Sequence, residues 1–177
     1  MTVTELDIPG VFLITPQVFS DSRGWFMETY NRLKTPQIEC DFVQDNHAYS
    51  SEKGVLRGIH FQYAPKAQAK LIRCVRGAIN DYVVDLRPDS TSFRHWIAIE
   101  LTEDNKEMLL IPRGFGHAYV TLESNTEVIY KADNYYSPEH DGAVRWSDPQ
   151  LGIDWGIKNP ILSEKDKNAP FLDEIKL

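Results

Sequence analysis

Short apolar or alternating segments, separated by turn-forming residues, cover most of the 177-residue chain. The turns recur at roughly the 8–12-residue spacing that is typical of an all-β sandwich or barrel. Residues 95–101 (HWIAIEL) alternate with a period of two, which predicts a strand with one solvated face, whereas residues 78–86 are apolar enough for a buried strand. The predicted strands are residues 10–19, 25–30, 42–50, 54–62, 70–75, 78–86, 95–101, 108–111, 118–122 and 127–136.

Turn and cap signals refine this prediction. Residues 21–24 (DSRG) predict a tight turn, and Arg76-Gly77 predicts a hairpin bend between its flanking strands. A helical signal is clear only near the C-terminus, where Ser163 is expected to cap a short helix that ends before Pro170. Residues 28–35 are a weaker helical candidate. With no repeat, low-complexity tract or linker, residues 1–177 are predicted to form a single domain, all-β with short helices.

Composition and charge then exclude several classes of protein. A chain that is 42% hydrophobic and 25% charged is typical of globular proteins rather than disordered ones. The net charge of −7 argues against an electrostatic nucleic-acid surface. No apolar run approaches the roughly 20 residues of a membrane span, and the first residues lack the features of a signal peptide. Two cysteines are too few for a disulfide scaffold or a thiolate zinc site, so a cytoplasmic location is expected.

Histidines are the first candidates for chemistry, because imidazole titrates near neutral pH and serves as a general base. On a regular strand Arg57 and His60 would face opposite sides, unless Gly58 marks a bulge. His117 follows a bend, PRGFG, that delivers it into the next strand. Gln62 stands where a metal-binding barrel would offer a second histidine, so no metal site is predicted. A catalytic histidine also needs a carboxylate partner, and sequence spacing cannot choose it among 26 acidic residues.

Six sets of motifs occur together, in order, between about residues 10 and 170, and over this span the chain resembles the dTDP-4-dehydrorhamnose 3,5-epimerases. A single motif of this kind would be weak evidence, but six in register are specific. They are LRGIHFQ (56–62), QAKL (68–71) with VRG (75–77), IPRGFGHAY (111–119), YK (130–131) with YY (135–136), WSDP (146–149) with GIDW (152–155), and LSEKD (162–166).

The resemblance implies a cupin-type double-stranded β-helix, or jelly roll, and a homodimer that works without a metal or other cofactor. It further implies an isomerase that inverts C3 and C5 of a nucleotide-linked 4-keto-6-deoxyhexose. The product would be dTDP-4-dehydro-L-rhamnose, a precursor of L-rhamnose in cell-envelope polysaccharide. No nucleic-acid or membrane partner is expected.

The same resemblance assigns catalytic roles. His60 matches the base that removes protons beside the C4 ketone, and Asp166 matches its carboxylate partner. Tyr130 matches the acid that returns a proton to the opposite face. Lys70 matches the cation near the developing enolate oxygen. Taken alone, Tyr130 would be a core tyrosine, Lys70 a solvated lysine and Asp166 a helix-stabilising residue.

Further positions match substrate contacts of the family. Arg23 and Glu28 match residues that reach into the neighbouring subunit's site, and Tyr135 is a candidate for stacking on the nucleotide base. Asp141 stands where many members carry a glutamate, which leaves the identity of the base open. The remaining matches to substrate-contacting positions are Gln44, Asn46, Arg57, His117 and Lys165.

Three other functions stay open from the residues alone. A relative that epimerises only C3 or only C5 would share the base and the acid. A metal-dependent cupin enzyme and a non-catalytic sugar-binding jelly roll are the less favoured alternatives. The three tryptophans Trp25, Trp146 and Trp155 are expected in the core rather than at a ligand.

Overall fold

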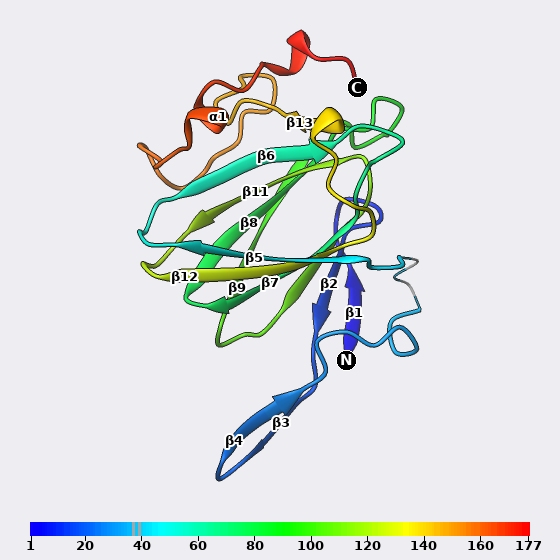
Figure 1. Ribbon diagram of the computed structural model, residues 1–177, viewed down its shortest axis with the longest axis vertical. Helices are drawn as coiled ribbons and strands as arrows, with labels where there is room; N and C mark the ends of the chain where they lie inside the picture. The colour runs from blue at the N-terminus through cyan, green and yellow to red at the C-terminus, as the bar shows by residue number, and fades with distance from the viewer. Residues whose placement is uncertain (37, 39) are drawn as a thin grey trace.

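Two antiparallel β-sheets lie face to face in the computed structural model of this protein, which describes residues 1–36, 38 and 40–177 (Figure 1). The six-stranded sheet contains, in spatial order, β1 (Thr2–Glu5), β2 (Phe12–Thr15), β10 (Met108–Ile111), β7 (Lys70–Arg76), β12 (Thr126–Ala132) and β5 (Gln44–Ser50). The five-stranded sheet contains β13 (Asp141–Ala143), β6 (Leu56–Gln62), β11 (Phe115–Thr121), β8 (Ala78–Asp85) and β9 (Trp96–Thr102). From β5 to β13 the chain alternates between the two sheets at every strand except the β8–β9 pair, which confirms the predicted all-β jelly roll.

The space between the sheets is filled mainly by alternate side chains of the inner strands. Ile72 and Val128 come from the six-stranded sheet, and Ile79, Val83 and Phe115 come from the five-stranded sheet. These residues follow the two-residue period of a strand, so one face of each sheet supplies the core. At one end the packing gives way to the polar side chains of the candidate site.

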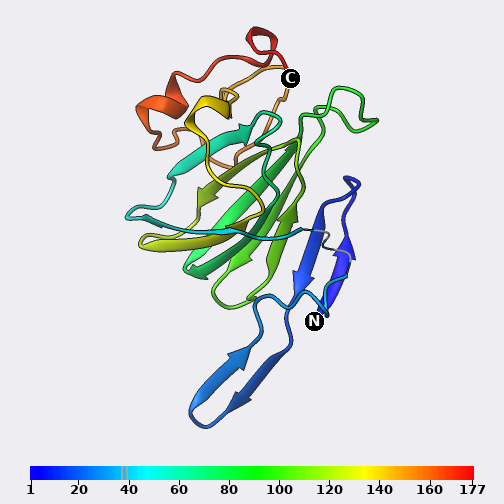
Figure 2. The same cartoon turned by 45° about the vertical axis from the view of Figure 1, so that its right-hand side comes forward.

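A second apolar layer covers the outer face of the five-stranded sheet. Residues after β13 wrap over this face and carry the short helices α1 (Glu164–Lys167) and η2 (Leu172–Glu174), whereas η1 (Pro138–His140) directly precedes β13 (Figures 1 and 2). Trp155 and Leu172 pack there against Tyr82. Asp148 fastens the layer by accepting a hydrogen bond of 2.6 Å from the Leu172 amide. The predicted helix is α1, and the Ser163 hydroxyl caps it by accepting from the amide of Asp166.

A separate two-stranded hairpin projects from the sandwich and consists of β3 (Val18–Asp21) and β4 (Gly24–Met27) (Figures 1 and 2). Its turn is the one predicted at residues 21–24. Because Pro16 cannot donate a hydrogen bond to a ladder, the predicted strand 10–19 divides into β2 and β3. The hairpin exposes the aromatic rings of Phe19, Trp25 and Phe26. The expectation of a buried Trp25 is therefore wrong, since the residue is 53% exposed.

Two local predictions fail for tertiary reasons. Arg76-Gly77 is not a hairpin bend, because β7 and β8 belong to different sheets and Gly77, at φ +73°, turns the chain from one to the other. Residues 28–35 contain turns rather than a helix. Within the described residues, no helix is long and apolar enough to cross a membrane.

Candidate active site

A cavity of about 450 Å³ opens between the two sheets. The six-stranded sheet contributes Lys70 and Tyr130 to its wall, and the five-stranded sheet contributes His60 and His117. The segment around α1 closes one side. The lining residues are Ala48, Val55, Leu56, Arg57, His60, Lys70, His117, Tyr119, Tyr130, Ile161, Leu162, Ser163, Lys165 and Asp166. Seven predicted site residues from distant parts of the chain thus meet in one cavity.

A bulge at Gly58 brings Arg57 and His60 to the same side of β6. His60 pairs with His117 and Arg57 pairs with Tyr119, so three steps along β6 match two steps along β11. Gly58 has a φ of +130°, and a Cβ there would lie 2.4 Å from the Cβ of Ala118. Only glycine fits this close strand approach. The bulge that the sequence left as an alternative is therefore present, and it aims both side chains into the cavity.

His60 is paired with a buried carboxylate. Its Nε2 lies 2.5 Å from Oδ1 of Asp166, which the N-terminal turn of α1 holds in place. Burial raises the pKa of Asp166, but the hydrogen bond and charge of His60, with smaller effects from Ser163 and Gly58, outweigh it and leave that pKa below its ordinary value. The carboxylate stays ionised at neutral pH, so it can fix the ring orientation and stabilise an imidazolium.

A second histidine–carboxylate pair lies beside the first. Nε2 of His117 is 2.5 Å from Oδ1 of Asp81, which is fully buried on β8. Burial lowers the pKa of His117, and the charges of Lys70 and His60 lower it further. The charge and the hydrogen bond of Asp81 raise this pKa, but it stays below its ordinary value. The ring is therefore neutral at neutral pH, with the Nε2 hydrogen directed to Asp81 and a lone pair left on Nδ1.

Lys70 faces this pair from the opposite sheet. Burial lowers its pKa to about 8, while the negative charges of Asp81 and Asp141 raise it again in part. Its Nζ lies 5.9 Å from the centroid of the Tyr130 ring. Burial also raises the pKa of Tyr130, so the phenol keeps its proton at neutral pH. An ammonium group and a phenolic donor therefore lie across the cavity from the two histidines.

The rim of the cavity is positively charged although the whole chain is acidic. Arg57 donates to the carbonyl of Tyr49 at 2.9 Å, which holds its guanidinium at the opening. Lys165 forms an ion pair with Asp141, and that hydrogen bond raises the pKa of Lys165. Since a pocket's field depends on its nearest charges, this rim can attract an anionic ligand.

Three further predicted residues lie along one edge of the six-stranded sheet. Asn46 is the strand partner of Tyr130 and accepts a hydrogen bond of 3.0 Å from the side chain of Gln44. Gln44 in turn accepts from the amide of Tyr136. Tyr135 is exposed in the adjoining loop, whose backbone is bound by the buried side chain of Gln62. Gln44 and Asn46 therefore lie on the same face of β5 as Ala48, which lines the cavity.

Two predicted residues lie outside the cavity of their own chain. Arg23 is in the turn of the β3–β4 hairpin, 88% exposed, and its guanidinium is paired with Asp21 at 2.6 Å. Glu28 follows β4 and pairs with Lys34. The hairpin points away from the sandwich (Figure 2), so these side chains lie away from the cavity of their own chain.

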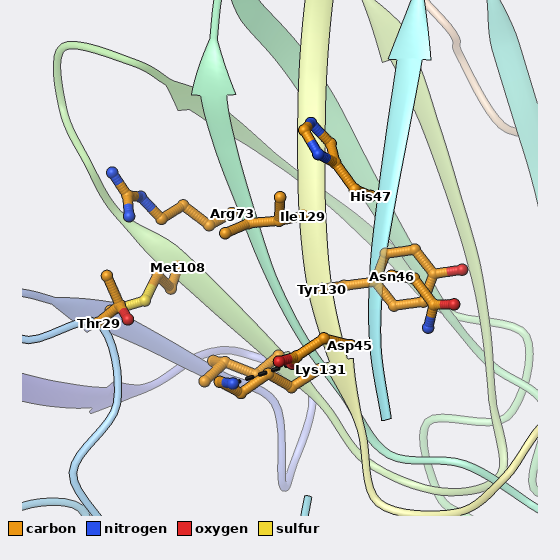
Figure 3. Close-up of a pocket in the computed structure, with 10 residues that line it drawn as sticks. Thr29, Asp45, Asn46, His47, Arg73, Met108, Ile129, Tyr130 and Lys131 are labelled. Atoms are coloured by element: carbon orange, nitrogen blue, oxygen red, sulfur yellow. Dashed lines mark hydrogen bonds and ion pairs between the residues drawn. The ribbon is translucent and has the colours of Figure 1, made fainter. Parts of the chain in front are cut away.

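A smaller pocket of about 310 Å³ lies on the outer face of the six-stranded sheet. Figure 3 shows Arg73 and Met108 on this face, with Lys131 joined to Asp45 by an ion pair. Tyr130 and Asn46 extend to the other side of their strands (Figure 3). The outer pocket therefore contains none of the histidine–carboxylate pairs of the cavity.

Sequence analysis overlooked two residues of the site. Asp81 sits in an apolar strand with no local feature that marks it as a partner of His117. Tyr119 had a usable signal, because it lies two residues after His117 and must share its face of the strand. Among the described residues, no group of three or more histidine, cysteine, aspartate or glutamate side chains could hold a metal ion.

The arrangement combines a histidine base, a phenolic donor on the opposing sheet and a buried ammonium group. Such a set can remove a proton from a carbon acid, stabilise the resulting oxyanion and return a proton from another direction. The fold and the site together define a jelly-roll enzyme of the proton-transferring, isomerase class.

Comparisons with known proteins agree with this class. Residues 5–174 match the family described as dTDP-4-dehydrorhamnose 3,5-epimerase, and the chain belongs to that family. The enzyme of that name from Salmonella typhimurium is 45% identical over 181 residues, covering 100% of this chain and 98% of the relative. A crystal structure of the Bacillus anthracis epimerase with TDP and PPi bound is 47% identical with a TM-score of 0.93, covering 96% of this chain and 98% of that one.

Two other solved structures bear on the choice of substrate and product. The Legionella pneumophila 3,5-epimerase in complex with dTDP-4-keto-L-rhamnose is 35% identical with a TM-score of 0.93, covering 99% of this chain and 94% of that one. A 3'-monoepimerase from Streptomyces bikiniensis in complex with dTDP-quinovose is 34% identical with a TM-score of 0.88, covering 95% of this chain and 86% of that one. Double and single epimerases therefore share this fold.

Proposed function

We propose that this isomerase inverts C3 and C5 of dTDP-4-dehydro-6-deoxy-D-glucose and yields dTDP-4-dehydro-L-rhamnose. Support comes from family membership over nearly the whole chain and from relatives about 45% identical that carry this activity in their names. The single observation that carries the proposal is the placement of His60 and Tyr130 on opposing sheets of one cavity.

In the proposed mechanism His60 removes the proton from a carbon next to the C4 ketone and becomes an imidazolium. The electron pair of the broken C–H bond forms a double bond between that carbon and C4 of the sugar, and the ketone oxygen becomes an enolate oxygen. Tyr130 then gives its hydroxyl proton to the same carbon from the opposite face, which inverts the centre. Proton exchange with water restores neutral His60 and the phenol before the second carbon reacts. Asp166 stabilises the imidazolium throughout.

Lys70 is the proposed stabiliser of the enolate. Removing one hydrogen-bond donor to such an oxyanion typically lowers the rate by a factor of roughly 10²–10³. His117 is neutral, with its Nε2 hydrogen directed to Asp81, so it contributes a hydrogen-bond acceptor rather than a second cation. Asp81 supplies the buried negative charge that keeps Lys70 protonated.

Arg57 and Lys165 are proposed to bind the diphosphate, since a guanidinium fork suits phosphate oxygens. Gln44, Asn46, Tyr135 and Asp141 are proposed to contact the nucleotide end of the substrate. Arg23 and Glu28 are proposed to complete the site of the second subunit in a homodimer. The exposed aromatic hairpin that carries Arg23 supports this assignment. We place the enzyme in the cytoplasm as a single domain, residues 1–177, that feeds L-rhamnose into cell-envelope polysaccharide.

Incubation of the purified protein with the 4-keto substrate in D₂O tests the proposal. Each inversion exchanges a carbon-bound proton with solvent, so the product should carry deuterium at both C3 and C5, as measured by proton NMR. Deuterium at one carbon only would instead identify a single-carbon epimerase, the main alternative. Turnover that requires stoichiometric metal, or no turnover at all, would reject the proposed mechanism in favour of a metal-dependent enzyme or a sugar-binding protein.

A further inference from the structure

Tyr119 lines the cavity but takes no part in the proposed proton transfers. Its side chain is only 5% exposed, and within the described part of the chain its hydroxyl has no partner of normal hydrogen-bond geometry, although Ser50 lies near enough to lower its pKa. The great majority of buried side-chain polar atoms in folded proteins have a hydrogen-bond partner, because an unpaired one keeps its desolvation cost. A hydroxyl in this position at a cavity wall is ready to bind a group that enters the cavity.

The strand register gives the position of Tyr119 relative to the reacting groups. On the paired strands β6 and β11, His60 lies opposite His117, and Tyr119 lies opposite Arg57. Tyr119 thus lies at the same step of the paired strands as the proposed diphosphate-binding arginine, two residues along β11 from His117 and on the same face. A nucleotide sugar with its reacting carbons at His60 and its diphosphate at Arg57 would place its hexose ring beside Tyr119.

The chemistry of the phenol narrows the kind of atom that it can bind. Burial raises the pKa of Tyr119 to about 12, against smaller lowering effects of Arg57 and Ser50, so the group is a neutral donor at neutral pH. A diphosphate oxygen is better matched by the cations of the rim. A neutral phenol suits a neutral oxygen such as a sugar hydroxyl.

We propose that the Tyr119 hydroxyl donates a hydrogen bond to a hydroxyl oxygen of the bound hexose and so contributes to recognition of the sugar. This inference rests on the proposed nucleotide-sugar substrate. A site that hydrogen-bonds a substrate hydroxyl discriminates against a ligand that lacks it, because the buried donor is then left unpaired.

Binding of two probes to Tyr119→Phe tests the inference by calorimetry. The probes are dTDP, which has no hexose, and dTDP-glucose, an unreactive analogue with a complete hexose. The variant keeps the aromatic ring and loses only the hydroxyl. We expect its affinity for dTDP-glucose to fall about 3- to 10-fold, and its affinity for dTDP to remain that of the wild type.

Tyr82→Phe is the matched control. The Tyr82 hydroxyl donates to the carbonyl of Asp154 at 3.2 Å in the outer apolar layer, away from the cavity. Its loss should lower the melting temperature and leave both affinities unchanged. Tyr119→Phe should lower the melting temperature less than Tyr82→Phe does, because the Tyr119 hydroxyl has no partner of normal hydrogen-bond geometry in the free protein.

Three outcomes would overturn the inference: unchanged affinity for dTDP-glucose, an equal loss for dTDP, or the same loss in Tyr82→Phe. The second outcome would move the contact to the nucleotide or the diphosphate. Since these readouts measure binding, they are independent of turnover. Failure of the D₂O experiment on the wild-type enzyme would reject the proposed epimerisation separately.

Discussion

A lysine stabilises an enolate oxygen only while its amine carries a proton. The charge balance at Lys70 is delicate, because burial lowers its pKa to about 8 and the charges of Asp81 and Asp141 hold it from falling further. Asp81 therefore acts on two groups: it fixes the ring of His117, and it supports the charge of Lys70 on the opposing sheet. The activity of this site should therefore fall at alkaline pH, where that amine loses its proton.

We predict that kcat/KM falls as pH rises through about 8, when Lys70 loses its proton. Lys70→Met should lower activity by roughly 10²–10³. Asp81→Asn removes a charge that raises the Lys70 pKa, so the decline in kcat/KM of this variant should begin at lower pH than in the wild type. The measurement is a pH–rate profile. Lys131→Met, on the outer face of the same sheet, is the control and should keep the wild-type profile. An unchanged profile in Asp81→Asn would contradict the electrostatic role.

Strand β6 is the element on which the geometry of the site depends. Without the bulge at Gly58, Arg57 and His60 could not both face the cavity. The strand reaches this conformation because Gly58 adopts a positive φ directly against the backbone of β11. A side chain at this position would push the two strands apart and displace His60 from Asp166.

We predict that Gly58→Ala costs about 2–5 kcal/mol of unfolding free energy, from steric overlap and backbone strain combined. Denaturant unfolding measures the loss, and epimerase activity should fall with it. Gly152→Ala is the control, because Gly152 also has a positive φ (+57°) but no atom lies within 4 Å of its added Cβ. It should cost about 1–2 kcal/mol through strain alone. Equal losses in the two variants would argue against a steric role for Gly58.

At the scale of the whole molecule, the two-stranded hairpin is a prominent exposed surface. The β3–β4 hairpin extends from the sandwich (Figure 1). It exposes three aromatic rings and carries Arg23 in its turn. Large exposed apolar surfaces of this kind mark interaction sites. In the proposed homodimer each hairpin would deliver Arg23 to the other subunit's cavity, as a two-fold interface requires of both copies.

We predict that two inactive variants complement each other when their subunits mix. His60→Ala lacks the base, and Arg23→Ala lacks the group proposed to act in the partner's site. A mixed dimer contains one site with both residues intact, so co-expression should restore about a quarter of wild-type activity for random pairing. Co-expression of His60→Ala with Lys70→Met subunits is the control: if both residues act in their own chain's cavity, each site of the mixed dimer lacks one of them, so this mixture should recover no activity. A mixture of His60→Ala with an Arg23→Ala, Lys70→Met double variant should recover nothing. Activity of purified Arg23→Ala near that of the wild type would contradict the shared site.

Much of this architecture follows from local patterns. The two-residue periods, the turn at residues 21–24 and the cap at Ser163 are properties of neighbouring residues, and the structure contains all of them. The failures at Arg76-Gly77 and at Trp25 have a different origin. Whether a strand continues into the same sheet, and whether an aromatic ring is covered, depends on segments far away in the chain.

By itself the sequence determined the fold class and the chemical groups available, because strand periodicity, turn residues and motif order are encoded locally. Only the tertiary structure decided how those groups combine. It paired His60 with Asp166, 106 residues away, chose Asp81 for His117, and set Lys70 and Tyr130 on the opposing sheet. The physical reason is that burial and charge act through space, so the state of each proton depends on neighbours that folding alone brings together.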